Sequence, residues 1–458
     1  MNEVKQNKMG TAPVSKLMLS MGLPMIISMI VQAFYNIVDS FFVSRMQDDM
    51  TANIGEYAVN ALTLSFPIQL LIIAVGVGTG VGINSLLSRS LGEKKFEKAA
   101  KIAGNAVFLG ICTYLVFLLF GIFGTKTFLK TQTSDALSIQ LGCDYLGICC
   151  IFSFGAVGSM IFEKLLQSTG KTVLSTVAQL AGAITNIVLD PILIYGLFGL
   201  PEMGIKGAAY ATVIGQILTT VLGIVFHVKF NKEIKTSLKY IKPEKNIIKG
   251  IYKVGIPAII IQALMSVMTY GLNIILGTIS QSAVTAYGIY YKIQQFVFFA
   301  AFGMNNTIIP VKAYNYGMGS KKRVNEGIKY GMLYTLILML LGMLGLQLFA
   351  HQICSAFSLS AETEKLCIIS IRIISLGYLF AGANIAYQGI FQALGFGIKS
   401  LVISLVRLLI VVLPCAWILT LLAGAEKLVW AAVPFAEFIG LIVSLIFMRS
   451  TKKDMQLQ

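Results

Sequence analysis

The chain has 458 residues, of which 56% are hydrophobic and only 12% are charged. This composition and a mean hydropathy of +0.80 exclude an ordinary soluble domain and indicate a membrane protein. The formal net charge of +16 lies in short connections between apolar stretches, so it does not predict a nucleic-acid partner.

Apolar stretches follow one another along the whole chain, and each has about the 20 residues that a helix needs to span a bilayer. Twelve are predicted, at 17–43, 57–82, 102–123, 141–163, 173–198, 207–228, 254–278, 284–311, 329–350, 366–391, 400–423 and 428–448. The polar segment Met1–Lys16 lacks the cleavage site of a signal peptide, so the first helix is expected to stay as an anchor. The sequence therefore predicts an all-α integral membrane protein with twelve transmembrane helices.

Basic residues concentrate in alternate connections between these stretches. These connections are Arg89 to Lys101, 229–253, Lys312 to Lys329, the turn at Lys399 and the tail from Arg449. Cytoplasmic connections of membrane proteins carry such an excess of lysine and arginine, so both termini are expected in the cytoplasm. The segment 124–140 departs from this pattern, because it is expected outside and yet contains Lys126 and Lys130.

The second half of the chain repeats the first. A shift of 225 positions superposes a series of identical residues, namely Ala58 on Ala283, Gln69 on Gln294, Gly78 on Gly303, Gly92 on Gly317 and Gln167 on Gln392. Each half holds an even number of spans, so the two halves are expected to be parallel repeats, as in many transporters. The predicted organisation is a six-helix lobe over 1–228, a basic cytoplasmic linker over 229–253 and a second six-helix lobe over 254–458.

Two acidic residues lie inside predicted spans of the first half, Asp39 in the first and Asp190 in the fifth. A charge inside the membrane is costly and indicates function, and removal from water favours the protonated form of a carboxylate. The shift of 225 places Leu264 and Cys415 opposite these acids, so only the first lobe carries them. Polar residues on or beside the same helix faces are further candidates. Those for the substrate cavity are Gln32, Tyr35, Asn36 and Gln179, and Asn186 is a candidate for the ion-coupling site together with the two acids.

Other charges in the spans have simpler interpretations. Glu163 and Lys164 lie at the cytoplasmic end of the fourth span, where snorkelling toward water explains them. Arg407 and Glu437, on the last two spans, are predicted to form a structural ion pair.

Methionines and tyrosines of the seventh and eighth spans are further candidates for the substrate cavity. They are Met265, Met268, Tyr287 and Tyr291. Such side chains suit the binding of flat organic cations, but they also serve as ordinary packing residues, and the sequence leaves both interpretations open.

Neither a metal site nor a cofactor is predicted. None of the seven cysteines stands at metal-ligand spacing, and the two histidines, His227 and His351, lie near helix ends. A GxxxxGK[ST] phosphate loop is missing from the sequence, so direct ATP hydrolysis is not supported. An enzyme is therefore not expected.

The sequence resembles the multidrug and toxic compound extrusion (MATE) family, most closely its MepA- and DinF-like bacterial branch. The resemblance spans the chain and rests on five segments: Gly78-Thr79-Gly80 through Gly92, Asn186 through Ile194, Gly204 through Ala209, Pro310 through Gly317, and Gln392 through Gly395.

The resemblance implies two six-helix lobes around a V-shaped central cavity, in a multi-pass protein of the bacterial cytoplasmic membrane. It implies antiport of small cationic, amphipathic compounds, with Asp39, Asn186 and Asp190 exchanging the coupling ion. Protons are the expected ion and sodium is the alternative. Family members with a second cation site place acids in helices seven and ten, but 254–278 and 366–391 contain none. The protein is expected to act as a monomer, with membrane lipid and its substrates as partners.

Three other functions are open to a protein with many membrane spans. A lipid-linked oligosaccharide flippase has a related architecture, but its pyrophosphate substrate favours an arginine-rich cavity, and the arginines here are few. A membrane-embedded enzyme requires a clustered nucleophile or a His-Asp set at one membrane face, which the sequence lacks. A channel is also possible, but the sequence contains no obvious pore motif.

Overall fold

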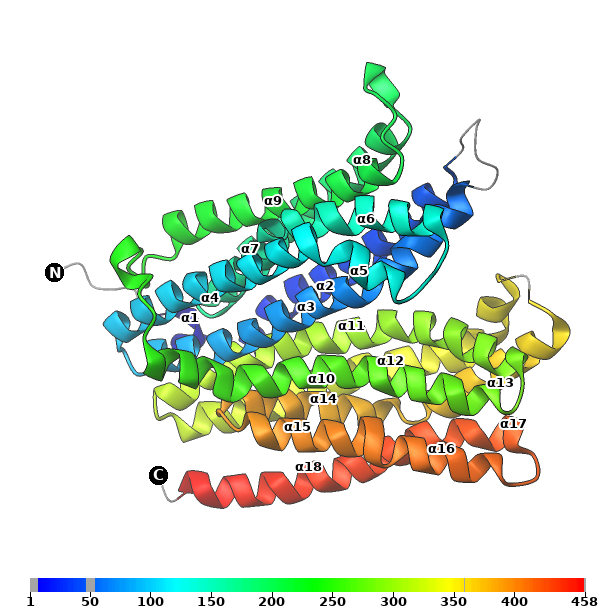
Figure 1. Cartoon of the computed structure of the whole chain (residues 1–458). Coiled ribbons are helices and arrows are strands. Elements are labelled where there is room, and N and C mark those ends of the chain that lie inside the picture. The colour runs from blue at the N-terminus through cyan, green and yellow to red at the C-terminus, as the bar shows by residue number, and fades with distance from the viewer. Residues whose placement is uncertain (1–6, 47–53, 358, 457–458) are drawn as a thin grey trace.

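The computed structural model describes residues 7–46, 54–357 and 359–456, and every regular element in these ranges is a helix (Figure 1). Ten helices are long and apolar enough to cross a membrane, and two bent helix pairs bring the number to twelve. The predicted all-α membrane fold is confirmed.

The helices of the first half run from α1 to α9. They are α1 (Lys8–Thr11), α2 (Val14–Ser44), α3 (Ile54–Gly92), α4 (Phe96–Phe123), α5 (Thr125–Lys130), α6 (Ala136–Ile151), α7 (Phe154–Gln167), α8 (Thr172–Ile194) and α9 (Ile205–Phe230). Those of the second half are α10 (Lys245–Gly277), α11 (Gln281–Gly317), α12 (Lys321–Ser355), α13 (Ala361–Ser375), α14 (Tyr378–Ala393), α15 (Gly397–Leu405), α16 (Val412–Thr420), α17 (Ala425–Leu428) and α18 (Ala432–Gln456). A π-helical segment, Val406–Ile410, joins α15 to α16.

Two predicted spans are not straight. The stretch 141–163 falls on α6 and α7, which meet at an angle of 43°, and the stretch 366–391 falls on α13 and α14, which meet at 52°. Neither break contains a proline. The apolar pattern of the sequence continues through both breaks, so it did not predict them. The shift of 225 carries Ile151, the last residue of α6, to within one residue of Ser375, the last residue of α13, so the repeats share the bend.

The connection between the halves is shorter than predicted. Helix α9 continues to Phe230 and α10 already begins at Lys245, so the last third of the expected linker 229–253 is helical. Only residues 231–244 lie between the two helices, and they include one turn of 3₁₀ helix, Leu238–Tyr240.

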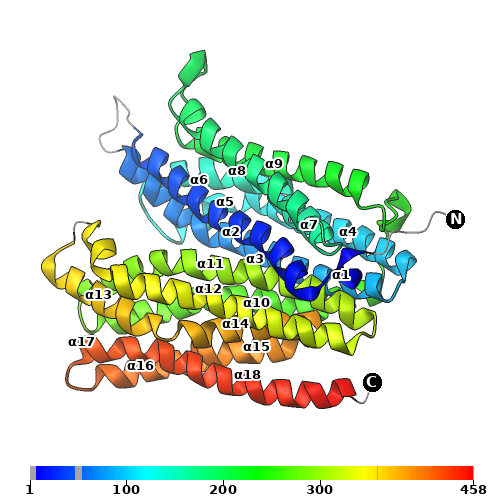
Figure 2. The same cartoon turned by 180° about the vertical axis from the view of Figure 1, so that it is seen from behind.

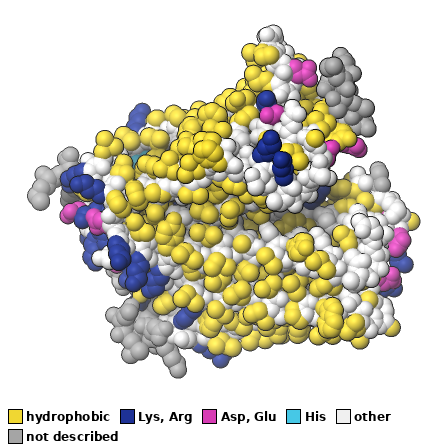
Figure 3. Space-filling model, in the orientation of Figure 1, with side chains coloured by type: hydrophobic (Ala, Val, Ile, Leu, Met, Phe, Trp, Pro, Cys, Tyr) yellow, Lys and Arg dark blue, Asp and Glu magenta, His cyan; other side chains and the backbone are white. Residues whose placement is uncertain are grey.

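Helices α2–α9 pack as one bundle and α10–α18 as a second, with both ends of the chain at the same end of the molecule (Figures 1 and 2). We call this end the terminal end and the opposite one the far end. The bundles meet where α2 and α3 pack on α10 and α11. Toward the far end they diverge, and the surface is hollowed between them (Figure 3). The shape is the predicted V.

Two glycines place the two bundles in close contact. A Cβ atom on Gly92 of α3 would lie 2.0 Å from the carbonyl oxygen of Tyr314, and one on Gly317 of α11 would lie 2.2 Å from that of Arg89. The shift of 225 turns Arg89 into Tyr314 and Gly92 into Gly317, so the two contacts are copies of one another. The duplicated sequence therefore forms a pseudo-symmetric crossing of α3 and α11.

Substitution of Gly92 by alanine is expected to destabilise the protein, because the added methyl group meets backbone that cannot rotate away. Overpacking of this kind costs about 1–3 kcal/mol. Thermal unfolding in detergent measures the effect. Gly345→Ala is the matched control, because a Cβ atom there meets nothing within 4 Å. Equal unfolding temperatures for both variants would show that the crossing is not tightly packed.

Candidate ion-coupling site

Asp39 lies near the far end of α2 and points into the first bundle. Its side chain is buried, whereas Phe34, Ile37 and Phe41 on the opposite face of the helix are exposed. The ring of Phe34 contacts that of Phe296 on α11, with centroids 5.5 Å apart. Asp39 stands five residues beyond this contact, about 7.5 Å by helical rise, which places it beside the base of the V.

Asp190 lies near the far end of α8 and is fully buried. The Asn186 side-chain amide donates hydrogen bonds to Asp190 Oδ1 at 3.4 Å and to Thr212 Oγ1 on α9 at 3.3 Å. Asn186 and Asp190 are one helical turn apart, so the same face of α8 presents both groups. The predicted pairing of these two residues is present.

The two acids lie on neighbouring helices of the first bundle, α2 and α8. These helices pack on each other, and both acidic side chains are buried near their far ends. The Gln69 amide of α3 donates to the Tyr145 hydroxyl at 3.1 Å and contacts Cys149 Sγ at 3.9 Å. Polar groups of α3 and α6 therefore pair with one another in the same bundle as the two acids.

Oxygen atoms of this site remain without partners. Within the described ranges, Oδ1 of Asp39, Oδ2 of Asp190 and Oδ1 of Asn186 are buried and accept no hydrogen bond. Burial of an unpartnered carboxylate oxygen is costly, and a bound proton or cation removes that cost. The arrangement is suited to take up and release a small cation.

The polar candidates of the first lobe fall into two groups. Tyr35 and Gln32 lie one and two helical turns before Asp39 on α2, on the same side of the helix. Asn36 belongs to α2, but its side chain lies outside the described part of the chain. Gln179 is the exception. It lies nearer the terminal end of α8 and donates a hydrogen bond to Glu163 Oε2, in a separate network.

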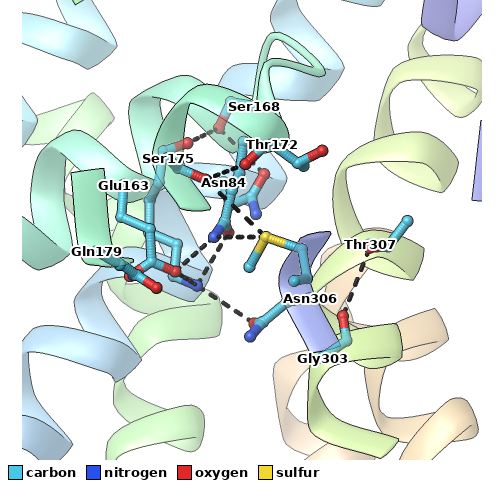
Figure 4. A network of polar contacts seen from close by, with 12 residues as sticks. Asn84, Glu163, Ser168, Thr172, Ser175, Gln179, Gly303, Asn306 and Thr307 are labelled. Carbon is cyan, nitrogen blue, oxygen red and sulfur yellow. Dashed lines mark hydrogen bonds and ion pairs between the residues drawn. The ribbon is translucent and has the colours of Figure 1, made fainter. Parts of the chain in front are cut away.

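That second network joins the bundles toward the terminal end (Figure 4). The Lys164 ammonium lies 3.1 Å from Glu163 Oε1, 3.0 Å from Gln167 Oε1 and 3.2 Å from Asn306 Oδ1 on α11. Lys164 is 3% exposed. The expectation that Glu163 and Lys164 snorkel toward water is therefore wrong. Lys164 can stay buried because the neighbouring residue on α3 is a glycine, Gly80. A Cβ atom on Gly80 would lie 2.7 Å from Lys164 Cγ, so the absence of a side chain there leaves room for the lysine.

Further contacts close the terminal end. Ser85 Oγ on α3 donates to the carbonyl oxygen of Gln392 on α14 at 2.7 Å. The short helix α1 is held by the second bundle, because the carbonyl oxygen of Met9 accepts hydrogen bonds from Asn315 at 3.0 Å and Arg323 at 2.9 Å. In this conformation the V is open at the far end and shut at the terminal end.

The candidates on α10 and α11 lie in the hydrophobic core of the second bundle. Met268 and Tyr287 are buried, and Met265 and Tyr291 pack against the same cluster. The rings of Tyr287 and Tyr291 have centroids 6.2 Å apart. Packing accounts for these four residues in this conformation, and their contact with substrate stays a prediction.

The ion pair predicted between the last two spans is confirmed. Arg407 Nη2 lies 3.0 Å from Glu437 Oε1, with both side chains buried. The Asn384 amide on α14 donates to Glu437 Oε2 at 2.9 Å. The pair therefore connects three helices of the second bundle.

A family model decides the identity of the fold. The model MatE matches residues 24–192 and 257–448, one block in each bundle. The chain belongs to the MatE family. This MatE protein is accordingly a membrane transporter and not an enzyme.

Relatives of this MatE protein match over almost their whole length. It is 24% identical over 435 residues to the multidrug export protein MepA of Staphylococcus aureus (strain bovine RF122 / ET3-1), covering 95% of this chain and 94% of the relative. It is 25% identical over 418 residues to MepA of Staphylococcus saprophyticus (strain ATCC 15305), covering 91% and 90%.

Solved structures share the fold of this MatE protein. One, described as an outward-facing conformation of a multidrug resistance MATE family transporter of the MOP superfamily, superposes with a TM-score of 0.91 at 24% identity over 99% of both chains. Another, a MOP superfamily transporter from Pyrococcus furiosus with a binding pocket of reversed polarity, gives 0.86 at 23% identity over 98% of both chains.

The sequence did not indicate four polar residues of the first bundle in this MatE protein. Thr212 accepts a hydrogen bond from Asn186, and Gln69 contacts Tyr145 and Cys149. Gln69 carried a signal, since it is a polar amide inside a span and recurs as Gln294 in the repeat. Tyr145 and Cys149 carried none, because tyrosine and cysteine are ordinary residues of apolar helices.

Proposed function

We propose that this MatE protein is a proton-coupled antiporter that acts as a monomer and exports small cationic, amphipathic compounds across the bacterial cytoplasmic membrane. The observation that carries the proposal is the pair Asp39 and Asp190, two buried acids with oxygen atoms that lack partners. The name of its MepA relatives, multidrug export proteins, supports the substrate class.

The proposed orientation places the terminal end in the cytoplasm. Basic side chains gather at that end of the surface (Figure 3), as the positive-inside rule expects. The V then opens to the outside, where protons enter the site and substrate leaves.

In the proposed cycle the two acids link proton and substrate. Their charged form attracts a cation from the cytoplasm when the V opens inward. Protonation from outside removes this attraction and releases the substrate. A ligand shifts a conformational equilibrium only through different affinities for the two states, and the change in charge of Asp39 and Asp190 supplies that difference.

Efflux of a cationic dye from cells tests the coupling ion. The proton gradient and the sodium gradient are collapsed separately, each with a selective ionophore. Export is expected to stop when the proton gradient is removed and to continue without the sodium gradient. Loss of export only when the sodium gradient is removed would overturn proton coupling.

A further inference from the structure

A groove of about 450 Å³ lies at the far end of the first bundle, between α4, α5, α6 and α9. Its volume falls in the range of small-molecule sites. Neither α2 nor α3, through which the bundles meet, contributes to it, and its rim residues Ile122 and Tyr210 are partly exposed. The groove therefore opens toward the membrane and not into the V, which separates it from the ion-coupling site.

The floor of the groove is apolar and open. Gly147 lies in it, and a Cβ atom built on this glycine meets no atom within 4 Å. The isoleucines Ile122, Ile148 and Ile151 line the groove. From Cys143 to Ile151 it follows α6 for about 12 Å by helical rise. An extended hydrocarbon chain fits a trough of this shape and chemistry.

The rim of the groove is charged. Lys206 Nζ lies 3.4 Å from Asp144 Oδ1, with the two side chains 52% and 29% exposed. Lys126, exposed in the first turn of α5, directly follows Thr125, which lines the groove. Two lysines and one aspartate leave a net positive charge at the rim of the groove.

These lysines also need an explanation that topology does not provide. In the proposed orientation the far end lies outside, where basic residues are not favoured. Lys126 and Lys206 nevertheless stand there, beside an apolar groove. Basic residues near a membrane surface attract anionic lipid, each by about 1 kcal/mol.

The geometry points to a binding site for one anionic phospholipid of the far-end leaflet, such as phosphatidylglycerol. Its phosphate lies between Lys126 and Lys206, and an acyl chain lies over Gly147. Asp144 holds the Lys206 ammonium over the groove. The site is independent of the proposed antiport, because it uses no residue of the ion-coupling site.

Native mass spectrometry of the purified full chain, titrated with phosphatidylglycerol or phosphatidylcholine, tests the site. Phosphatidylglycerol is expected to remain bound at the higher collision energy. The exposed variant Lys206→Gln is expected to weaken its binding about fivefold, the effect of one basic residue. Gly147→Leu fills the groove and is expected to remove the bound lipid. Gly288→Leu is the matched control, since a Cβ atom there also meets nothing within 4 Å but Gly288 does not line this groove.

Equal retention of the two lipids, or unchanged phosphatidylglycerol binding in Lys206→Gln, would overturn the proposal and leave only the general lipid shell. Binding of glycerol phosphate as strong as that of the lipid would also contradict it, because the acyl chain would then contribute nothing. The Lys206→Gln result decides the matter even where Gly147→Leu does not fold.

Discussion

Replacement of Asp39 by asparagine is expected to reduce gradient-driven export to the level of cells that lack the protein. The amide has nearly the size and shape of the carboxyl group, so the packing between α2 and α8 remains. It cannot take up or release a proton in the physiological range, so the site keeps one charge state throughout the cycle. Dye efflux from energised cells measures the loss, and the amount of folded protein in the membrane is determined alongside.

Asp135→Asn is the matched control for this substitution. Asp135 belongs to the same bundle, but it is exposed and caps α6 by accepting a hydrogen bond from the Ser138 amide at 2.7 Å. Asparagine caps a helix as well as aspartate does, so this variant is expected to export normally. Normal export by Asp39→Asn would remove Asp39 from the coupling mechanism.

Replacement of Glu437 by leucine is expected to give the largest loss of stability. The substitution leaves the buried Arg407 without a counter-charge. Nε and Nη1 of this guanidinium have no hydrogen-bond partners within the described ranges, so the ion pair with Glu437 is its main compensation. Removing one member of a buried ion pair costs about 3–5 kcal/mol. The unfolding temperature in detergent should fall sharply, with a lower yield of folded protein.

The double variant Arg407→Met with Glu437→Leu distinguishes a lost charge from lost packing. Apolar residues of similar volume often replace a buried ion pair without loss of stability. The double variant is therefore expected to regain most of the stability that Glu437→Leu loses. If Glu437→Leu alone unfolded like the original protein, the pair would contribute nothing to the second bundle.

Hydropathy and charge predicted much of the fold, because the bilayer imposes length and polarity on each span. The duplication was visible in the sequence and recurs as paired contacts at Gly92 and Gly317. The bends after α6 and α13 were not predictable, since no proline or polar run marks them. Arg407 and Glu437 were predictable as a pair, because unlike charges in neighbouring spans have few other partners.

The candidate site was predictable only along single helices. Periodicity placed Asn186 beside Asp190, but it says nothing about contacts between distant spans. The hydrogen bond of Gln179 to Glu163 was therefore not predicted, and its contact with substrate stays a prediction. The burial of the Lys164 side chain depends on the space that Gly80 leaves on another helix. Such pairings arise from tertiary packing, which no local pattern encodes.

The central claim is that Asp39 and Asp190 carry the coupling protons. Its most direct test is substrate-induced proton movement in proteoliposomes, followed with a trapped pH indicator. The original protein is expected to move protons when a cationic substrate is added, and the double variant Asp39→Asn with Asp190→Asn is expected to move none, although it is folded and present in equal amount. Undiminished proton movement in the double variant would contradict the account.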